Sequence, residues 1–331
     1  MRSMTGIRLA LIVPLLLLAS GCGSGEKKTK ALKPVTLAAY AGDTCLLAYL
    51  AEDKGFFEEA GVEVTLRDFQ AGKLAVDDML AGKSDLALGA DFVFVNQSFS
   101  HPELRIMAAV CESMVNHLVV RKDHDITEPG DLAGKRIGVT RGSAGEFYLG
   151  TFLLFQGFRM SQVTMVDLKP NEIVDQLLSG SIDAGLTWEP NVYKLEQALG
   201  GAVQSWPAQS GQPMYFLLQG QAEWVQGHEA EIRAVLAAMR QAEAFVAGHQ
   251  DQAQGFLVDR FGLDTGYVEA TWGKQDFLLA LPQELLVQMG DQAAWMVDTE
   301  QKAGASIPNF YEKVVFPPLE QVDPGAVTII R

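Results

Sequence analysis

Basic side chains are scarce in this sequence relative to acidic ones. The 331 residues include 26 Lys and Arg against 41 Asp and Glu, so the formal net charge at pH 7 is -15. Binding to a phosphate backbone requires a positively charged surface, and the chain is therefore not expected to bind nucleic acid. The hydrophobic fraction of 48% is that of a chain that builds a packed core.

Cysteine and histidine are also few. Apart from Cys22 the chain has only Cys45 and Cys111, which is too few for a disulfide framework. In an oxidising compartment these two either pair or remain buried thiols, because the sequence gives no distance between them. The histidines are His101, His117, His124, His228 and His249. No two of them have the i, i+4 spacing of an H-E-x-x-H helix, so neither a metal site nor a cofactor is predicted.

A long apolar run is missing as well. The run at residues 9–19 is too short for a transmembrane helix, which needs about 20 residues. Arg2 and Arg8 precede the run, and small residues follow it. This pattern predicts an export signal over residues 1–22.

The end of that signal indicates a lipid anchor. Cys22 follows Ala19-Ser20-Gly21, which resembles the lipobox of bacterial lipoproteins except that Ala19 replaces the usual leucine. We therefore expect lipid attachment at Cys22 and a membrane anchor through this N-terminal lipid, with a plainly cleaved secretory signal as the alternative. Residues 23–34 are polar and are predicted to form a flexible tether.

An internal repeat is the strongest feature of the remaining chain. Residues 76–91, VDDMLAGKSDLALGAD, align with residues 174–189, VDQLLSGSIDAGLTWE, with six identities in sixteen positions. Upstream, each copy has a helix-like run that ends at a Gly-Phe pair and is followed by an extended run. The alternation of strand and helix is typical of a parallel sheet with helices on both faces. About 300 residues are enough for two such lobes.

The predicted elements follow this repeat. The first copy is expected to form strands at 35–40, 62–68 and 86–89, with helices at 44–54 and 73–81. The second is expected to form strands at 135–140, 163–168 and 184–187, with helices at 144–156 and 171–179. Further strands are expected at 106–113, 117–122 and 214–219. Beyond residue 221 the pattern is helical, and these helices are expected to pack on the first lobe.

Two lobes of this kind place a cleft between them, because ligands of open α/β sheets bind at the carboxyl ends of the strands. Gly142, Ser143 and Ala144 begin a helix there and are expected to present N–H groups and a hydroxyl to an anion or a carbonyl. Ser143 and Glu146 also fit the S-x-x-E capping box, which explains Glu146 without a ligand. Arg141 either contacts an anion or lies in solvent. The stretch is not G-x-S-x-G, so a hydrolase nucleophile is not predicted.

Three segments, GFFEEAGVEVTL, GVTRGSAGEFYL and LTWEP, are similar to solute-binding proteins of ABC importers for taurine, alkanesulfonates, nitrate and thiamine-type pyrimidines. The resemblance implies a type II periplasmic-binding fold, an α/β protein of two doubly wound lobes joined by two crossing strands. Lobe 1 would comprise residues 35–120 and 217–331, and lobe 2 residues 121–216. The hinges would be the strands at 117–122 and 214–219. The resemblance also implies a monomer, exported and lipid-anchored at the periplasmic side or cell surface, that serves an ABC permease and its ATPase.

The first lobe offers further site positions at its strand ends. Gly42, Asp43 and Thr44 form the turn after the first strand, where Asp43 either caps the helix or contacts the ligand. Tyr40 either stacks on a planar ligand or packs in the core. Gln70, with Gly72, is a weaker position at the end of the second strand.

The third strand of each copy ends at Ala90-Asp91 and at Trp188-Glu189. Trp188 is the strongest single expectation, because an indole at a strand end can stack in a cleft, and the alternative is a role in the core between the lobes. Glu189 either caps the next helix or contacts the ligand. Pro190 is expected in the first turn of that helix.

These residues also constrain the ligand. Burying Asp91, Glu146 or Glu189 against an inorganic anion would be costly, so the sequence favours a small organic ligand, a sulfonate, pyrimidine-type or other planar or amine-bearing compound, over bare nitrate or sulfate. No enzyme is predicted, because the pyrimidine synthases that share the implied fold carry a cysteine cluster and a catalytic histidine that have no counterpart here. Such an enzyme and a ligand sensor for a signalling partner are the alternative functions.

Overall fold

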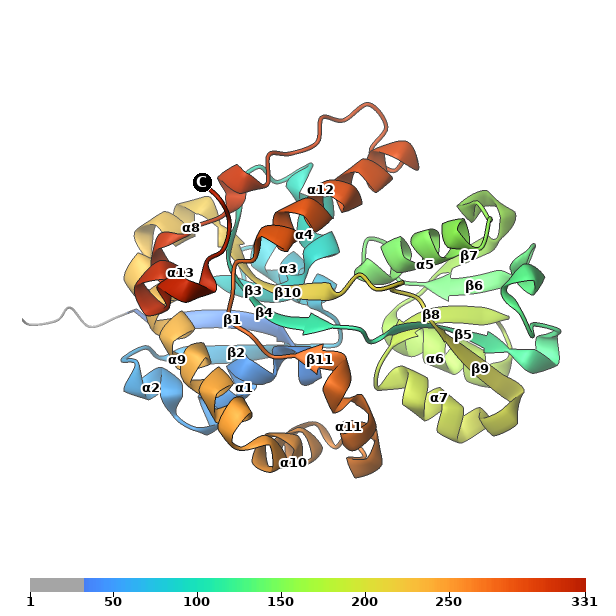
Figure 1. The fold of residues 1–331 in the computed structure, drawn as a ribbon, viewed down its shortest axis with the longest axis horizontal. Coiled ribbons are helices and arrows are strands. Elements are labelled where there is room, and N and C mark those ends of the chain that lie inside the picture. The colour runs from blue at the N-terminus through green and yellow to red at the C-terminus, as the bar shows by residue number, and fades with distance from the viewer. Residues whose placement is uncertain (1–32) are drawn as a thin grey trace, which may run out of the picture. The chain divides into compact units, whose positions relative to one another are not determined.

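Two β-sheets, each covered by helices, make up the computed structural model, which describes residues 33–331 (Figure 1). The six-stranded sheet has the order β11-β4-β10-β3-β1-β2, and the five-stranded sheet has the order β7-β6-β8-β5-β9. We call each sheet with its helices the first and the second lobe, respectively. The predicted α/β fold of two lobes is confirmed. The expected export signal, Cys22 and most of the tether lie outside the described residues.

The strands of the first lobe are β1 (Val35–Tyr40), β2 (Val64–Phe69), β3 (Leu86–Ala90), β4 (Leu104–Ser113), β10 (Met214–Gln221) and β11 (Gln275–Asp276). Those of the second lobe are β5 (Asn116–Arg121), β6 (Arg136–Val139), β7 (Thr164–Asp167), β8 (Ala184–Trp188) and β9 (Val203–Pro207). The helices before β5 are α1 (Leu46–Asp53), α2 (Phe56–Glu59), α3 (Gly72–Leu80) and α4 (Asp91–Ser98). The second lobe adds α5 (Ala144–Phe155), α6 (Pro170–Ser179) and α7 (Asn191–Leu199). The C-terminal helices are α8 (Ala222–Gly227), α9 (Glu229–Gly248), α10 (Gln250–Phe261), α11 (Thr265–Thr271), α12 (Gln283–Asp298) and α13 (Pro317–Val322).

The internal repeat corresponds to one structural unit in each lobe. In the first lobe β1 pairs in parallel with β2 and β3, and in the second lobe β6 pairs in parallel with β7 and β8. The predicted strand and helix bounds of both copies agree with the structure to within about two residues, inside the usual uncertainty of element ends. Both units therefore present their strand carboxyl ends and helix starts in the same way.

The chain passes between the lobes twice. It leaves the first lobe at residues 114–115, after β4, and returns at residues 208–213, before β10. The strands that the resemblance implied as hinges, 117–122 and 214–219, lie instead almost entirely within β5 and β10. Each of these strands hydrogen-bonds to neighbours of a single sheet along its length and so moves with one lobe.

The side chain of Gln209 connects the two crossing segments. Its Oε1 accepts hydrogen bonds from the backbone N–H and the side-chain Nδ2 of Asn116, at 2.8 and 3.1 Å. Its Nε2 donates to the carbonyl oxygens of Ser113, at 2.8 Å, and Gln212, at 3.1 Å. Gln209 is buried, so losing these bonds would leave polar groups unsatisfied away from water.

The C-terminal helices pack on the first lobe, as expected. Helix α9 packs on α1 and α2, α12 packs on α4, and β11 pairs with β4. Helix α12 also reaches the second lobe, where the ring of Trp295 meets Phe147 of α5 edge-on with 5.3 Å between ring centroids. Phe92 of α4 packs against both rings. This aromatic cluster is a direct contact between the lobes.

Some features needed the tertiary structure. Helix α4 and strands β9 and β11 were not predicted, since α4 is almost wholly buried and shows no polar face, and the two strands are short. Pro190 precedes α7 instead of entering its first turn. Of the two alternatives for Cys45 and Cys111, the structure has two free, buried thiols. In the part of the chain that the structure describes, no helix is both long enough and apolar enough to cross a membrane.

Candidate ligand-binding site

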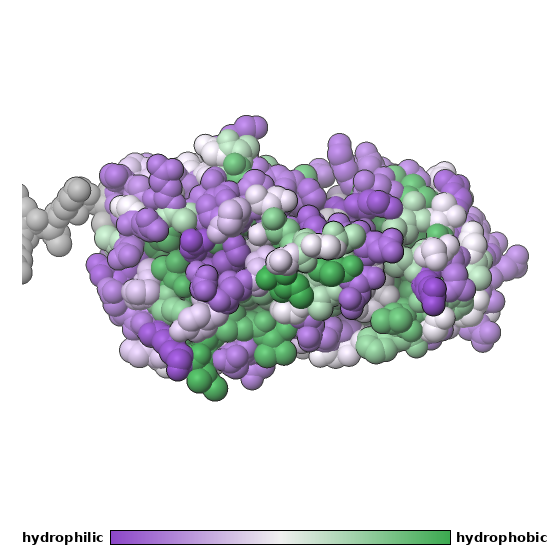
Figure 2. All heavy atoms as spheres, turned by 90° about the horizontal axis from the view of Figure 1, so that it is seen from above, coloured by the Kyte–Doolittle hydropathy of each residue, from purple (hydrophilic) through white to green (hydrophobic). Residues whose placement is uncertain are grey.

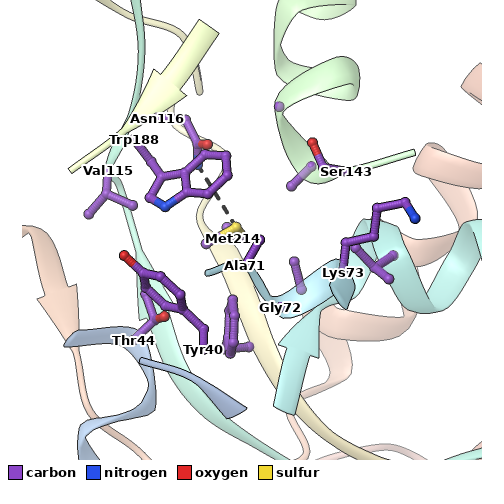
Figure 3. Close-up of a pocket in the computed structure, with 15 residues that line it drawn as sticks. Tyr40, Thr44, Ala71, Gly72, Lys73, Val115, Asn116, Ser143, Trp188 and Met214 are labelled. Carbon is purple, nitrogen blue, oxygen red and sulfur yellow. Dashed lines mark hydrogen bonds between the residues drawn. The ribbon is translucent and has the colours of Figure 1, made fainter. Parts of the chain in front are cut away.

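A cavity of about 470 Å³, including its open mouth, lies where both lobes contribute strand ends and helix starts (Figure 3). We call it the inner pocket. Its lining residues are Tyr40, Thr44, Ala71, Gly72, Lys73, Ala90, Val93, Val115, Asn116, Ser143, Ala144, Gly145, Trp188, Met214 and Phe216. The lining is predominantly apolar and includes no carboxylate side chain.

Two aromatic side chains line the pocket, each from the last residue of its strand. Trp188, the last residue of β8, is half-buried, and Tyr40, the last residue of β1, lies below it in Figure 3. Tyr40 rests on Gly42, where a Cβ atom would lie only 2.3 Å from the ring, so a larger residue at 42 would displace the ring. Burial and the nearby Asp43 raise the pKa of Tyr40, while a hydrogen bond with Trp188 acts in the opposite direction. Tyr40 is therefore neutral at physiological pH.

The start of α5 offers free hydrogen-bond donors. The hydroxyl of Ser143 donates to the carbonyl oxygen of Thr140 at 2.6 Å, and Glu146 Oε2 accepts from the N–H of Gly142 at 2.7 Å. The predicted capping box is therefore wrong in detail, because Glu146 reaches Gly142 and Ser143 does not cap the helix. Among the described residues, none accepts a hydrogen bond from the backbone N–H of Ala144 or Gly145. These two donors lie at the pocket wall.

Two polar side chains on other elements have unused hydrogen-bonding capacity. The hydroxyl of Thr44 is buried and has no hydrogen-bond partner among the described residues. Asn116 uses its Nδ2 toward Gln209 and, at 3.9 Å, toward the sulfur of Met214, as the dashed line in Figure 3 shows. A buried hydroxyl without a partner, such as that of Thr44, gains most from a ligand that supplies the missing hydrogen bond.

The one basic side chain in the lining does not provide a free positive charge. Lys73 Nζ lies 2.6 Å from Asp77 Oδ2, one helical turn further along α3. In Figure 3 its side chain extends away from Trp188. Hydrogen bonds from backbone N–H groups and apolar contact therefore dominate what this pocket offers a ligand.

The predicted acidic residues point into the protein instead of the inner pocket. Asp43 accepts hydrogen bonds from the Tyr267 hydroxyl at 2.8 Å and Gln275 Nε2 at 2.7 Å, and Asp91 accepts from the backbone N–H of Phe92 at 2.7 Å. Burial raises the pKa of Asp43, opposed by these hydrogen bonds, and raises the pKa of Asp91 to about 6.

Glu189 is likewise engaged by the protein. Its carboxylate accepts from the backbone N–H of Tyr193 at 3.2 Å and lies 3.4 Å from Lys274 Nζ. Burial raises its pKa, and the charge of Lys274 opposes that shift. Asp91, Glu146 and Glu189 are all hydrogen-bonded to groups of the protein and line no part of the inner pocket, so the argument from these carboxylates against nitrate or sulfate does not apply to that pocket.

The predicted positions divide into three groups. Those that line the inner pocket are Tyr40, Thr44, Gly72, Ala90, Ser143, Ala144 and Trp188. Those that line an adjoining cavity, besides Tyr40 and Trp188, are Gly42, Asp43 and Gln70. Those that line neither are Asp91, Arg141, Gly142, Glu146 and Glu189. Arg141 is exposed and contributes its backbone N–H to Asp167.

Several lining residues were not predicted as site residues. They are Ala71, Lys73, Val93, Val115, Asn116, Gly145, Met214 and Phe216. Asn116 and Met214 follow the two crossing segments directly, and no local pattern in the sequence marks such positions. Across the described residues there is no group of three or more His, Cys, Asp or Glu side chains arranged to hold a metal ion.

Comparison with known proteins gives matches over most of the chain. A family model described as NMT1/THI5 like matches residues 45–253. A putative aliphatic sulfonates-binding protein of Bacillus subtilis (strain 168) is 28% identical over 273 residues, which cover 79% of this chain and 80% of that protein. The 4-amino-5-hydroxymethyl-2-methylpyrimidine phosphate synthase of Aspergillus parasiticus is 28% identical over 160 residues, 48% of this chain and 46% of that enzyme.

The fold also matches solved structures. The alkanesulfonate-binding protein SsuA from Xanthomonas axonopodis pv. citri, solved bound to MOPS, superposes with a TM-score of 0.77. The superposition covers 87% of this chain and 100% of that chain at 17% sequence identity, which establishes a shared fold.

Proposed function

Because the chain belongs to the NMT1/THI5-like family, we propose that it is the extracytoplasmic solute-binding protein of an ABC importer. It captures one small organic molecule in the inner pocket and delivers it to a membrane permease. The observation that supports this most is that one apolar pocket is lined by strand ends and helix starts of both lobes. A site of this construction is closed or opened by a movement of the lobes.

The pocket favours a compact polar head on an apolar body. Ala144 and Gly145 offer two free backbone N–H groups at the start of α5, where the helix dipole favours negative charge. No carboxylate lines the pocket to repel an anion, and Trp188 provides an aromatic face for the body of the ligand. The Bacillus subtilis relative is named as a putative aliphatic sulfonates-binding protein, and an organic sulfonate is the ligand class that we propose.

Capture requires the two lobes to move relative to each other. In our proposal they rotate about residues 114–115 and 208–213, where the chain crosses between the sheets. The ligand shifts the equilibrium toward the closed arrangement only to the extent that it binds that arrangement more tightly. The closed form then docks on the permease.

Membrane attachment is a separate part of the proposal and rests on the sequence around Cys22. Replacing Cys22 with serine removes the thiol that would carry the lipid, and the protein should then move from the membrane fraction to the soluble extracytoplasmic fraction. Fractionation of cells that express the wild-type protein or Cys22→Ser measures this. Retention of the serine variant in membranes would contradict the lipid anchor.

A thermal-shift screen with the purified chain tests the binding function. The panel should contain alkanesulfonates, pyrimidines, simple amines, nitrate and sulfate, because a compound that binds only the folded protein raises its melting temperature. We expect alkanesulfonates to stabilise the protein and inorganic sulfate to do so much less, since sulfate has no apolar body. Chemical conversion of any stabilising compound would favour the alternative of an enzyme related to the pyrimidine synthase.

A further inference from the structure

A second cavity adjoins the inner pocket and has a different chemical character. It encloses about 730 Å³, including its open mouth, and shares Tyr40 and Trp188 with the inner pocket. We call it the outer cavity. Its lining includes three amide side chains and a lysine, namely Gln70, Asn171, Asn191 and Lys194, whereas the inner pocket has one amide, Asn116, and a lysine that is paired with Asp77.

The charges around the outer cavity favour an anion. Lys194 is exposed on α7 and belongs to none of the ion pairs formed by the described residues. Pro170 and Asn191, the first residues of α6 and α7, also line the cavity, but Glu172 and Glu189 already occupy the starts of these helices. Both helices come from the second lobe, as does Lys194.

The one carboxylate in the lining is already held by hydrogen bonds within the protein. Both oxygens of Asp43 are occupied, Oδ1 by the N–H of Thr44 at 2.9 Å and Oδ2 by Tyr267 and Gln275. Asp43 is buried, and its raised pKa has burial as its main cause. The side chain in this cavity that carries a free charge toward solvent is therefore Lys194.

We propose that the outer cavity is a second subsite, which binds an anionic end of an elongated ligand whose apolar part occupies the inner pocket. This inference rests on the proposed function and narrows its ligand class to organic sulfonates that carry a second anionic group, such as a terminal carboxylate. Tyr40 and Trp188 line both cavities, so the body of the ligand passes beside their rings. Lys194 and the amide side chain of Asn171 hold the distal anion.

Binding of matched ligand pairs tests the subsite. Each pair consists of a plain alkanesulfonate and the alkanesulfonate of equal chain length with a terminal carboxylate, measured by isothermal titration calorimetry over a series of chain lengths. Beyond a threshold length, the carboxylated member should bind the wild-type chain more tightly. Lys194→Gln should weaken the carboxylated member about three- to tenfold and leave the plain one unchanged, as expected for loss of one partly solvated charge contact. Lys194→Glu should have a larger effect of the same kind.

The control is Lys122→Gln, which changes an exposed lysine of the second lobe outside both cavities. It should bind both members as the wild type does. The proposal is overturned if the carboxylate brings no gain at any length, or if Lys194→Gln weakens both members equally. If either of those results is found but plain alkanesulfonates still bind, only the subsite is contradicted and the proposed importer function is not. Failure of every sulfonate to bind contradicts the proposed function and the subsite together.

Discussion

Replacing Trp188 with alanine should weaken binding of an alkanesulfonate to the inner pocket by about 1–3 kcal/mol, or roughly five- to 150-fold in Kd. Trp188 ends β8 and contributes its indole to the walls of both cavities. The substitution removes the aromatic surface against which the body of the ligand packs and leaves a void that water fills.

The measurement is a calorimetric titration of wild type and Trp188→Ala with the alkanesulfonate that stabilises the protein most in the screen. Trp224→Ala serves as the control, because that indole stacks on His228 in the first lobe and lines neither cavity. The control should keep the wild-type affinity. If Trp188→Ala also keeps it, Trp188 takes no part in binding and the inner pocket is not the ligand site.

Gly150→Ala should weaken the same binding about five- to a hundredfold, although residue 150 lies outside the pocket. A Cβ at this position of α5 would lie 2.3 Å from the ring of Trp295 on α12. The indole has little room to yield, because it packs against Phe92 and Phe147. Overpacking of this kind costs about 1–3 kcal/mol. Since α5 and α12 belong to different lobes, the clash is relieved by moving the lobes apart, which opposes closure on the ligand.

A double-mutant cycle separates this effect from local damage to α5. Trp295→Leu makes room for the added methyl group, so Gly150→Ala combined with Trp295→Leu should recover affinity relative to Gly150→Ala alone. Gly201→Ala is the control, because a Cβ there meets no atom within 4 Å. Undiminished affinity of Gly150→Ala, or no recovery in the double variant, would show that this contact does not govern closure.

The sequence predicts the role of Trp188 but not the contact between Gly150 and Trp295. Trp188 was predicted because an aromatic residue directly after a buried strand of the repeat must lie at the ligand-binding edge of a sheet. The contact of Gly150 with Trp295 was not predictable, because the two residues are far apart in the sequence and neither has a distinctive neighbourhood. A glycine within an apolar helix indicates close packing but does not identify the partner.

For the acidic residues, the sequence indicated the position in the chain but not the direction of the side chain. Asp91, Glu146 and Glu189 were correctly placed near the cleft by their position after strands or at a helix start, yet each turns away from it. A carboxylate beside free N–H groups binds whichever donor is nearest, and that donor proved to be a group of the protein in all three cases. Which charge the pocket accepts was therefore not deducible from the presence of these acids in the sequence.

The sequence by itself determined the duplicated strand-helix order, the bounds of its elements and the edge at which a ligand would bind. These follow from local periodicity and from a repeat, both of which can be recognised from residues that are close together in the sequence. Only the tertiary structure decided where the chain crosses between lobes, which polar groups remain free in the pocket and that a second, polar cavity adjoins it. Asn116, Met214, Lys194 and Trp295 acquire their roles from contacts between distant segments, and side-chain direction at such contacts is set by packing and hydrogen bonding across the whole fold.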